Sequence, residues 1–597
     1  MFRSAPLRLL IIWASLTGPI LVSAGEPTEG ERLHQIFHDE WEWELKENPI
    51  MATFTGDPRY GDQVSDMSLE AIERRRRHAH DVKERLETID RDALSDDDQL
   101  NHDLFLLNTE QEIEGQLFRR ELMPITQMGG LHSQIATLAR MTPKFRAKQV
   151  DALITRLSQL PTVVDQMIVL MKKGLGLGLT PPRITLREVA GQIEAQITDD
   201  PTQSPVFVAA VGDLPSSIPR EEQERLRARA KTVVAEAVVP SIRKLHRFWV
   251  EEYYPKTREE IGVSALPDGA AWYDYNVKVR TTTDLTAEEI HQIGLREVTR
   301  IRAEMEKVKE EAGFEGSLSE FFEFLRTDPQ FFFTEPEDLL AAYRDIAKRV
   351  DPELVKLFGR LPRLPYGVTP VPKETEKTQT TAYYQPGSLE AGRPGYFYAN
   401  TYDLKSRPKW EMEALTVHEA VPGHHFQIAL AQELEDVPRF RRFGGYTAFV
   451  EGWGLYSESL GPDLGLYEDP YSRFGQLTYE MWRAIRLVVD TGIHAKGWTR
   501  QQAIDFFLEN AGKAEHDIVV EVDRYIVWPG QALAYKIGEL KIKELRQHAE
   551  ETLGDSFDVR TFHDTVLGAG AIPLSTLDER MKAWVEAQKA QVAASES

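Results

Sequence analysis

The residues best suited to chemistry in this sequence are grouped in one run, HEAVPGHH, at positions 418–425. A His-Glu pair followed by a further histidine on one helix is typical of zinc hydrolases. Two imidazoles would hold the metal. Glu419 would take a proton from the attacking water and pass it to the leaving amine. The run therefore predicts a hydrolase of amide bonds that uses one Zn²⁺ ion per chain.

The spacing of these histidines differs from the usual HExxH pattern, so the helix must be distorted between them. His424 and His425 follow His418 by six and seven residues. Seven residues of unbroken helix rise about 10.5 Å, too far for two imidazoles to share one zinc ion. Pro422 lacks an N–H, and Gly423 tolerates strained backbone angles. We expect a bulge that brings His424 beside His418, with His425 as the alternative ligand and otherwise a residue that supports the site or faces substrate.

A third ligand is expected from the following helix. Glu451 lies in an apolar segment, GGYTAFVEGWGLYSESL at residues 444–460. A buried carboxylate without a partner is costly there, and metal coordination would remove that cost. Glu458 lies seven residues further on the same helix face, where we expect it to orient a ligand from behind.

A later segment, DRYIVWPGQALAYK at residues 523–536, offers groups for the substrate. Tyr525 and Tyr535 are candidate donors to the oxyanion that develops during hydrolysis. Arg524 and Lys536 are candidates to hold the terminal carboxylate of a peptide, with Arg486 as a lesser one.

The elements that must position these residues begin with a small antiparallel sheet just before HEAVPGHH. Pro, Gly, Thr and Tyr are frequent at 361–403, and strands are predicted at 366–371, 380–384 and 395–400. An extended peptide can bind to the edge of a sheet through its backbone. The strand at 395–400 is the candidate edge, which makes Tyr398 and Asn400 candidate substrate-binding residues; a plain core strand is the alternative.

Most of the remaining chain predicts helices, so the expected fold is mainly α. Apolar residues recur at steps of three and four, the spacing of one helix face. These segments are residues 33–45, 69–86, 99–117, 150–171, 221–249 and 339–358. Thr286 before a Glu pair predicts the start of another long helix that ends near residue 310.

Composition excludes several classes of function. The formal charge of -24 argues against a nucleic-acid partner, because phosphate binding needs clustered Lys and Arg. The sequence has no cysteine, which excludes thiolate ligands and a cysteine nucleophile. Any transition metal must therefore bind to His, Asp or Glu.

Residues 1–24 predict a secretory signal peptide. Arg3 and Arg8 precede an apolar stretch that is too short to span a bilayer, and small residues before Gly25 suit cleavage after Ala24. An uncleaved signal anchor is the alternative. Cleavage would give a periplasmic or secreted protein of bacterial type with no stable membrane insertion.

The sequence resembles the bacterial proteins of the domain of unknown function family 885, which are marked by HEAxPGHH and a following EGWxLYxE. These motifs stand here at 418–425 and 451–458, and EVDRYIVWPGQALAYKIG at 521–538 also matches. The resemblance covers essentially the whole mature chain. It implies a relative of the gluzincin metallopeptidases, similar in shape to thimet oligopeptidase and angiotensin-converting enzyme. It also implies zinc on His418, on His424 or His425, and on Glu451, with Glu419 as general base.

The expected architecture is a two-lobed helical bowl around a deep cleft. An N-terminal helical lobe at 25–260 and a catalytic lobe at 261–597 would form one continuous family domain. The cleft would admit short peptides and exclude folded proteins. Two alternatives to a peptidase remain: a non-catalytic peptide-binding protein on the same scaffold, which would have no need of Glu419, and a zinc amidase that acts on cell-wall peptides.

Overall fold

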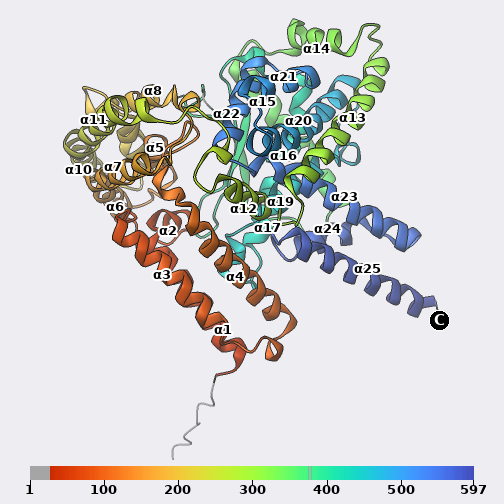
Figure 1. The fold of residues 1–597 in the computed structure, drawn as a ribbon, viewed down its shortest axis with the longest axis horizontal. Coiled ribbons are helices and arrows are strands. Elements are labelled where there is room, and N and C mark those ends of the chain that lie inside the picture. The colour runs from red at the N-terminus through yellow and green to blue at the C-terminus, as the bar shows by residue number, and fades with distance from the viewer. Residues whose placement is uncertain (1–26, 374, 378, 597) are drawn as a thin grey trace, which may run out of the picture.

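The computed structural model describes residues 27–373, 375–377 and 379–596. The predicted signal peptide, residues 1–24, lies outside these ranges. Within them, no helix is both long enough and apolar enough to cross a membrane. The chain is mainly helical, which confirms the expected fold class (Figure 1).

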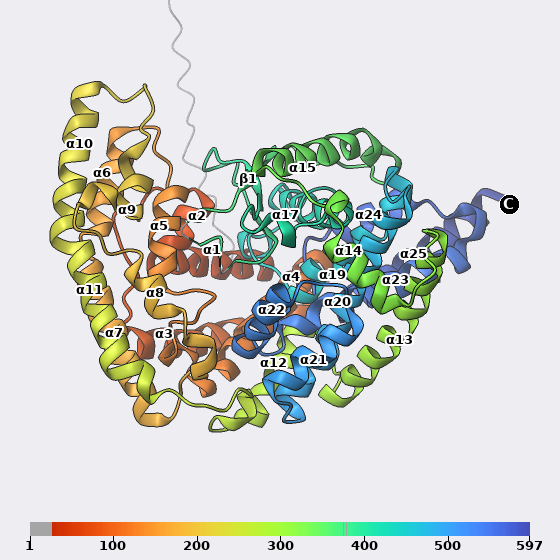
Figure 2. The ribbon, with the colours of Figure 1, turned by 90° about the horizontal axis from the view of Figure 1, so that it is seen from above.

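The helices before residue 260 form one side of the molecule. Figure 2 shows α10 and α11 along that side and the C-terminal helices α23 and α25 on the opposite side. The bounds of the first group are α1 Glu29–Glu47, α2 Pro49–Thr55, α3 Leu69–Leu86, α4 Asp96–Gly115, α5 Leu131–Met141, α6 Ala147–Leu157, α7 Leu160–Leu177, α8 Val189–Glu194, α9 Pro205–Phe207, α10 Arg220–Val233 and α11 Val239–Phe248.

Two helices predicted as continuous are interrupted, and a proline follows each break. The segment 150–171 divides between α6 and α7, and Pro161 lies at the start of α7. The segment 221–249 contains a π-helical turn, Val234–Val238, before Pro240. Proline has no N–H to donate to the preceding turn, so the regular hydrogen-bond ladder stops there.

The remaining helices carry most of the candidate site residues. Thr286 caps α13 through a reciprocal pair of hydrogen bonds with Glu289, as the sequence predicts. The bounds are α12 Gly269–Thr281, α13 Ala287–Glu311, α14 Leu318–Thr327, α15 Pro336–Val350, α16 Met412–Glu419, α17 His424–Gln432, α18 Arg439–Arg442, α19 Thr447–Glu458, α20 Pro470–Ala495, α21 Arg500–Asn510, α22 Glu515–Val527, α23 Ala534–Leu553, α24 Val559–Leu567 and α25 Leu574–Glu596.

The sheet has three strands at the predicted places, but it is mixed and not antiparallel. The strands are β1 (Tyr366–Pro370), β2 (Ala382–Gln385) and β3 (Gly395–Ala399), in the order β1-β3-β2. β3 runs antiparallel to β2 and parallel to β1. The chain passes from β1 to the far side before it returns as β3, and this crossover makes the β1–β3 pair parallel. The prediction that 395–400 forms a sheet edge is therefore wrong, because β3 is the central strand.

The two largest hydrophobic clusters of the described residues both contribute to the wall of a large cavity. The first contains buried residues from Ile125 to Tyr253, and the second contains most of the later helices together with the sheet. The cavity has a volume of about 1010 Å³, and its lining includes Met167 of α7, Trp272 of α12 and Trp528 just after α22. Met128 and Trp528 also line a smaller cavity that holds the candidate site.

Candidate metal centre and catalytic cavity

The HEAVPGHH segment is broken where Pro422 and Gly423 predict. α16 ends at Glu419 and α17 begins at His424, and the Val421–Pro422 peptide bond is cis. A Cβ at Gly423 would lie 2.0 Å from the carbonyl oxygen of His418, so only glycine is accommodated. The indole N–H of Trp453 donates to the Pro422 carbonyl at 2.8 Å. This turn, held to α19, places His424 beside His418.

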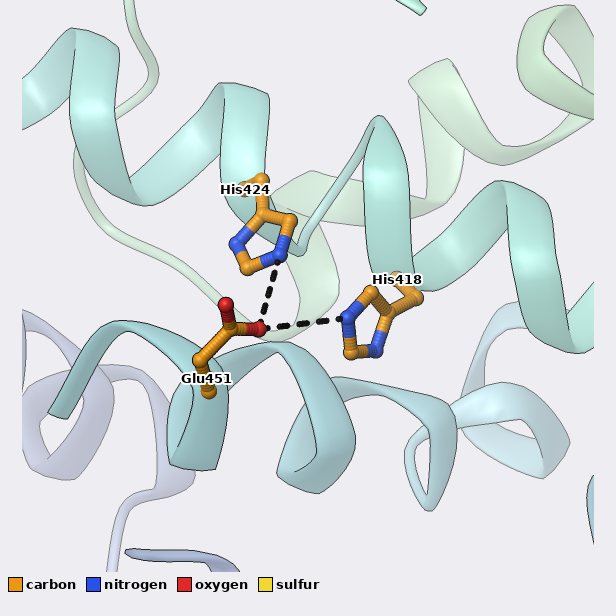
Figure 3. A group of neighbouring side chains, drawn as sticks. All are labelled: His418, His424 and Glu451. Atoms are coloured by element: carbon orange, nitrogen blue, oxygen red, sulfur yellow. Dashed lines mark ion pairs between the residues drawn. The ribbon is translucent and has the colours of Figure 1, made fainter. Parts of the chain in front are cut away.

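Three candidate ligands converge across the turn. One ligand atom each from His418, His424 and Glu451 lies within 4.8 Å of the other two. Glu451 Oε2 is 3.3 Å from His424 Nε2 and 3.8 Å from His418 Nε2 (Figure 3). The two imidazole planes are inclined at 82°, with ring centres 4.7 Å apart. Two imidazole nitrogens and a carboxylate oxygen so disposed are the donor set of a catalytic zinc site.

His418 is oriented from behind by Glu458. Its Nδ1 lies 2.8 Å from Glu458 Oε1, and that carboxylate is fully buried. Gly454 of α19 faces the ring closely, since a Cβ there would lie 2.9 Å from His418 Cε1. A carboxylate on the far nitrogen of a metal-binding histidine fixes its tautomer and ring position. The structure thus places Glu458 where the sequence predicts an orienting residue.

The electrostatics of the ligand group favour a cation. Burial by itself would lower the pKa of His418, but the carboxylates of Glu451 and Glu458 outweigh burial and raise it to about 9. Burial by itself would raise the pKa of Glu451, but the neighbouring His418 and His424 hold it well below the usual value. The Glu451 carboxylate, at the point where the ligand atoms meet, thus prefers a positive neighbour.

His425, the alternative ligand, points away from this centre. Its Nδ1 is hydrogen-bonded to the Tyr384 hydroxyl at 2.9 Å, and its ring packs 4.5 Å from that of Tyr366. Burial lowers the pKa of His425 to about 4, so the ring is neutral at physiological pH. His425 therefore joins α17 to strands β1 and β2, and His424 is the histidine that reaches Glu451.

Glu419 faces the cavity next to the ligand group. This cavity has a volume of about 370 Å³, and its wall includes Glu419 and the three candidate ligands. The Glu419 carboxylate has no hydrogen bond or ion pair with any residue in the part of the chain that the structure describes. A carboxylate that is free to exchange a proton, next to a metal centre, has the placement of a general base.

The two candidate tyrosines have different surroundings. The Tyr525 hydroxyl accepts hydrogen bonds from Trp482 Nε1 and Arg486 Nε, both at 2.9 Å, and its side chain is 1% exposed. The Tyr535 hydroxyl accepts from Arg524 at 2.9 Å and from Gln531 at 3.4 Å, and Tyr535 lines the cavity. Two accepted bonds leave the Tyr535 hydrogen free to be donated. Tyr535 therefore has the geometry of an oxyanion donor, whereas Tyr525 is enclosed.

The two basic residues predicted to bind a peptide carboxylate, Arg524 and Lys536, also differ in their surroundings. Arg524 lines the cavity. Lys536 is completely buried and forms ion pairs with Glu297, Glu480 and Glu539 at 2.6–3.1 Å. Those contacts use all three N–H donors of an ammonium group. The expectation that Lys536 binds substrate is thus not met, since the lysine instead joins α23 to α13 and α20.

The predicted substrate residues Tyr398, in β3, and Asn400, just after it, are not part of the cavity wall. Tyr398 stacks on Tyr383 with ring centres 4.9 Å apart. The Asn400 amide donates to the carbonyls of Glu376, Gln379 and Thr380, which shapes the loop before β2. β2 is an outer strand of the sheet, and it lines the cavity together with residues 379–381. The edge role assigned to β3 therefore passes to β2.

Sequence reasoning missed Arg483, which also lines the cavity. Its Nη2 lies 3.5 Å from Glu458 Oε1, and its guanidinium packs on the rings of Tyr479, Trp482 and Tyr535. The i, i+3 spacing of Arg483 and Arg486 on one helix signals a shared face, but it does not show that this face meets α16, which carries His418.

The group formed by His418, His424 and Glu451 is suited to bind a divalent metal ion. Glu451 Oε2 is buried and makes no hydrogen bond of acceptable geometry to a described residue, and the same is true of His424 Nδ1. A buried carboxylate oxygen in that state is costly unless a cation balances it. Nitrogen and oxygen ligands without sulfur suit zinc and other divalent transition metals.

Comparison with known proteins gives two solved structures of the same overall shape. A putative lipoprotein from Colwellia psychrerythraea superposes with a TM-score of 0.87 at 29% identity, covering 94% of this chain and 100% of the other. A putative lipoprotein of unknown function from Shewanella oneidensis gives 0.67 at 15% identity, covering 93% and 100%. A Pyrococcus furiosus carboxypeptidase gives only 0.36 at 12% identity, covering 94% and 99%, which is too low to indicate a shared fold.

Curated proteins give no match. A family model does match, over residues 49–581, and it is described as "Bacterial protein of unknown function (DUF885)". That range contains every candidate site residue described above. This chain is therefore a member of the DUF885 family.

Proposed function

We propose that this protein is a metallopeptidase that hydrolyses short peptides with one zinc ion per chain. The observation that carries the proposal is the convergence of His418, His424 and Glu451 within 4.8 Å, in the wall of the cavity that Glu419 faces. A non-catalytic peptide-binding protein would have no use for a free carboxylate at that place.

Each residue has a defined task in this proposal. His418, His424 and Glu451 would hold the metal, which supplies Lewis-acid activation of water and of the scissile carbonyl when bound. Glu419 accepts the proton of the attacking water and delivers it to the leaving amine nitrogen. The Tyr535 hydroxyl donates to the oxygen that gains negative charge. An extended peptide would lie along β2, the outer strand that lines the cavity.

Export is part of the proposal. The signal-like residues 1–24 and the names of the two structural relatives, both putative lipoproteins, support a periplasmic or secreted protein. The given sequence has no cysteine to carry a lipid. Sequencing of the N-terminus of the mature protein from its native host tests the cleavage after Ala24; an intact N-terminus would refute it.

The test is hydrolysis of a mixed library of short peptides by zinc-loaded wild type and by Glu419→Gln. Wild type should cut peptides and lose that activity with a chelator. Glu419→Gln should retain zinc and lose turnover by about 1,000-fold or more, since the variant lacks the proton acceptor. Equal turnover in both proteins would remove Glu419 from the mechanism. Failure of the zinc-loaded wild type to cut any peptide, cell-wall peptides included, would refute the proposal.

A further inference from the structure

Two buried arginines in the cavity wall carry more positive charge than their neighbours balance. Arg486 is 3% exposed and Arg524 is 9% exposed. Both are paired with the same carboxylate: Glu521 lies 2.9 Å from Arg486 Nη2 and 3.4 Å from Arg524 Nη1. Among the described residues, neither arginine has another acidic partner within ion-pair distance. One net positive charge therefore remains at this end of the cavity.

Both guanidinium groups also have donors without acceptors. Arg486 Nη1 and Arg524 Nε are buried and have no hydrogen-bond partner in the described part of the chain. A buried N–H that lacks an acceptor is costly, and more so on a charged group. The chemistry that would satisfy a guanidinium here is an anion with two oxygens, since a carboxylate matches its forked donors.

Tyr535 joins this arginine pair to the metal centre. Its ring lies 6.3 Å from the ring of His418, nearly parallel to it, and 4.4 Å from the Arg486 guanidinium carbon. Arg486 is thus no more than about 11 Å from His418. An extended peptide advances about 3.5 Å per residue. Part of the distance between His418 and Arg486 is taken up by the contacts that each of them makes with the substrate. The remainder accommodates one residue beyond the scissile bond and not a longer chain.

We propose that Arg486 and Arg524 bind the C-terminal carboxylate of the substrate, so that the enzyme is a carboxypeptidase that releases single amino acids. This inference rests on the proposed peptidase function and names its substrate class. Water adds to the carbonyl carbon of the penultimate residue, the C–N bond breaks, and the amine leaves with a proton from Glu419. The products are a free amino acid and a peptide one residue shorter.

The first test uses wild-type protein and matched peptides that end in a free acid or in an amide. The free acid should be cut with a kcat/KM at least 10- to 100-fold higher, the range for loss of a hydrogen bond to a charged group. Mass spectrometry should show loss of one residue at a time from the C-terminus. Equal cleavage of acid and amide would overturn the inference and leave the peptidase function standing. Cleavage of the amidated peptide next to an internal Asp or Glu would also overturn the inference, since the arginines would then bind a side-chain carboxylate.

The second test compares Arg524→Gln with Arg500→Gln. Arg500 forms an ion pair at 2.6 Å with Asp523, the residue that precedes Arg524 in the chain. Arg500 is not part of the cavity wall, so it serves as a matched control. In Arg524→Gln the ratio of acid to amide cleavage should fall toward one, and Arg524→Lys should restore part of it. Arg500→Gln should keep the wild-type ratio. An unchanged ratio in Arg524→Gln would contradict the assignment.

A binding measurement separates this inference from the peptidase function. Glu419→Gln protein should bind an uncut free-acid peptide at least 10-fold more tightly than its amide in calorimetry. Preference for the acid in a protein that cuts nothing would refute the proposed function but uphold the carboxylate site. Equal affinity for acid and amide would refute the carboxylate site whether or not peptides are cut.

Discussion

At the scale of single residues, the hydroxyl groups of Tyr525 and Tyr535 each accept two hydrogen bonds, but only Tyr535 lines the cavity. The sequence offers both as oxyanion donors, because they lie ten residues apart in one segment and share the same chemistry. Only the folded chain shows that Trp482 and Arg486 enclose Tyr525. The choice between them depends on neighbours that are remote in sequence.

Replacement of each tyrosine by phenylalanine tests this difference. Tyr535→Phe should lower kcat by about 100-fold with a small change in KM, because the lost donor acts on the transition state. Tyr525→Phe should instead reduce the free energy of unfolding by about 1–3 kcal/mol, since two buried donors lose their acceptor. Steady-state kinetics and chemical denaturation of both variants check the pair. A larger loss of kcat in Tyr525→Phe would reverse the two roles.

The roles of His424 and His425 also depend on neighbours that are remote in sequence. The choice of His424 over His425 was open to sequence reasoning, because a bulge of unknown geometry could present either ring. The structure places His425 against Tyr384 and Tyr366 in the sheet. Lys536 shows the opposite outcome: its charge suggested a substrate contact, whereas three glutamates, Glu297, Glu480 and Glu539, form ion pairs with it.

At the scale of elements, the turn between α16 and α17 brings the candidate metal ligands His418 and His424 together. Pro422 and Gly423 make this break predictable from sequence alone, because one residue ends a helix and the other tolerates close backbone contact. The order of the strands was not predictable, because pairing between β1 and β3 depends on the path of the chain between them. The edge that lines the cavity therefore became evident only with the fold.

Gly423→Ala should disrupt this turn. The added Cβ would lie 2.0 Å from the His418 carbonyl oxygen and 2.3 Å from that of Val417, so the backbone must move. We expect a loss of at least about 2 kcal/mol in unfolding free energy and loss of zinc binding through displaced His424. Gly191→Ala is the control, since its Cβ meets nothing within 4 Å. Wild-type zinc affinity in Gly423→Ala would show that the turn does not position His424.

At the scale of the whole molecule, residues that are far apart in sequence meet around one cavity. Met128 comes from the segment before α5, Tyr384 from the sheet, and Glu521 from α22. The helices were largely predictable because their periodic patterns are local, but the cavity depends on contacts across hundreds of residues. Motifs pointed to the candidate metal ligands because His418, His424 and Glu451 lie within 34 residues of the chain.

Asp490 couples this assembly to pH. Its carboxylate accepts from the Tyr273 hydroxyl at 2.6 Å and from the Gly530 N–H at 3.1 Å, so it joins α20 to α12 and to the segment before α23. Burial raises the pKa of Asp490 to about 7, although both hydrogen bonds oppose the shift. The folded state therefore holds a proton more tightly than the unfolded chain does. The contribution of protonated Asp490 to the free energy of unfolding is complete below about pH 4 and is lost as the pH rises through 7.

Asp490→Asn should remove this dependence, because an amide resembles the protonated carboxyl group and does not ionise. The wild-type free energy of unfolding should fall relative to the variant by up to about 4 kcal/mol between pH 4 and pH 8. Denaturation of both metal-free proteins across that range measures the difference. Parallel stability curves would show that Asp490 does not hold a raised pKa.

The measurement that tests the metal centre most directly is elemental analysis of the purified mature protein after reconstitution with zinc, beside His418→Ala and Glu451→Ala. About one zinc ion per chain in the wild type, and little in either variant, is the expected result. His425→Ala should retain the ion, since that histidine lies away from the ligand group. No bound metal in a folded, reconstituted wild type, or equal zinc in the His418 and Glu451 variants, would contradict the proposed site.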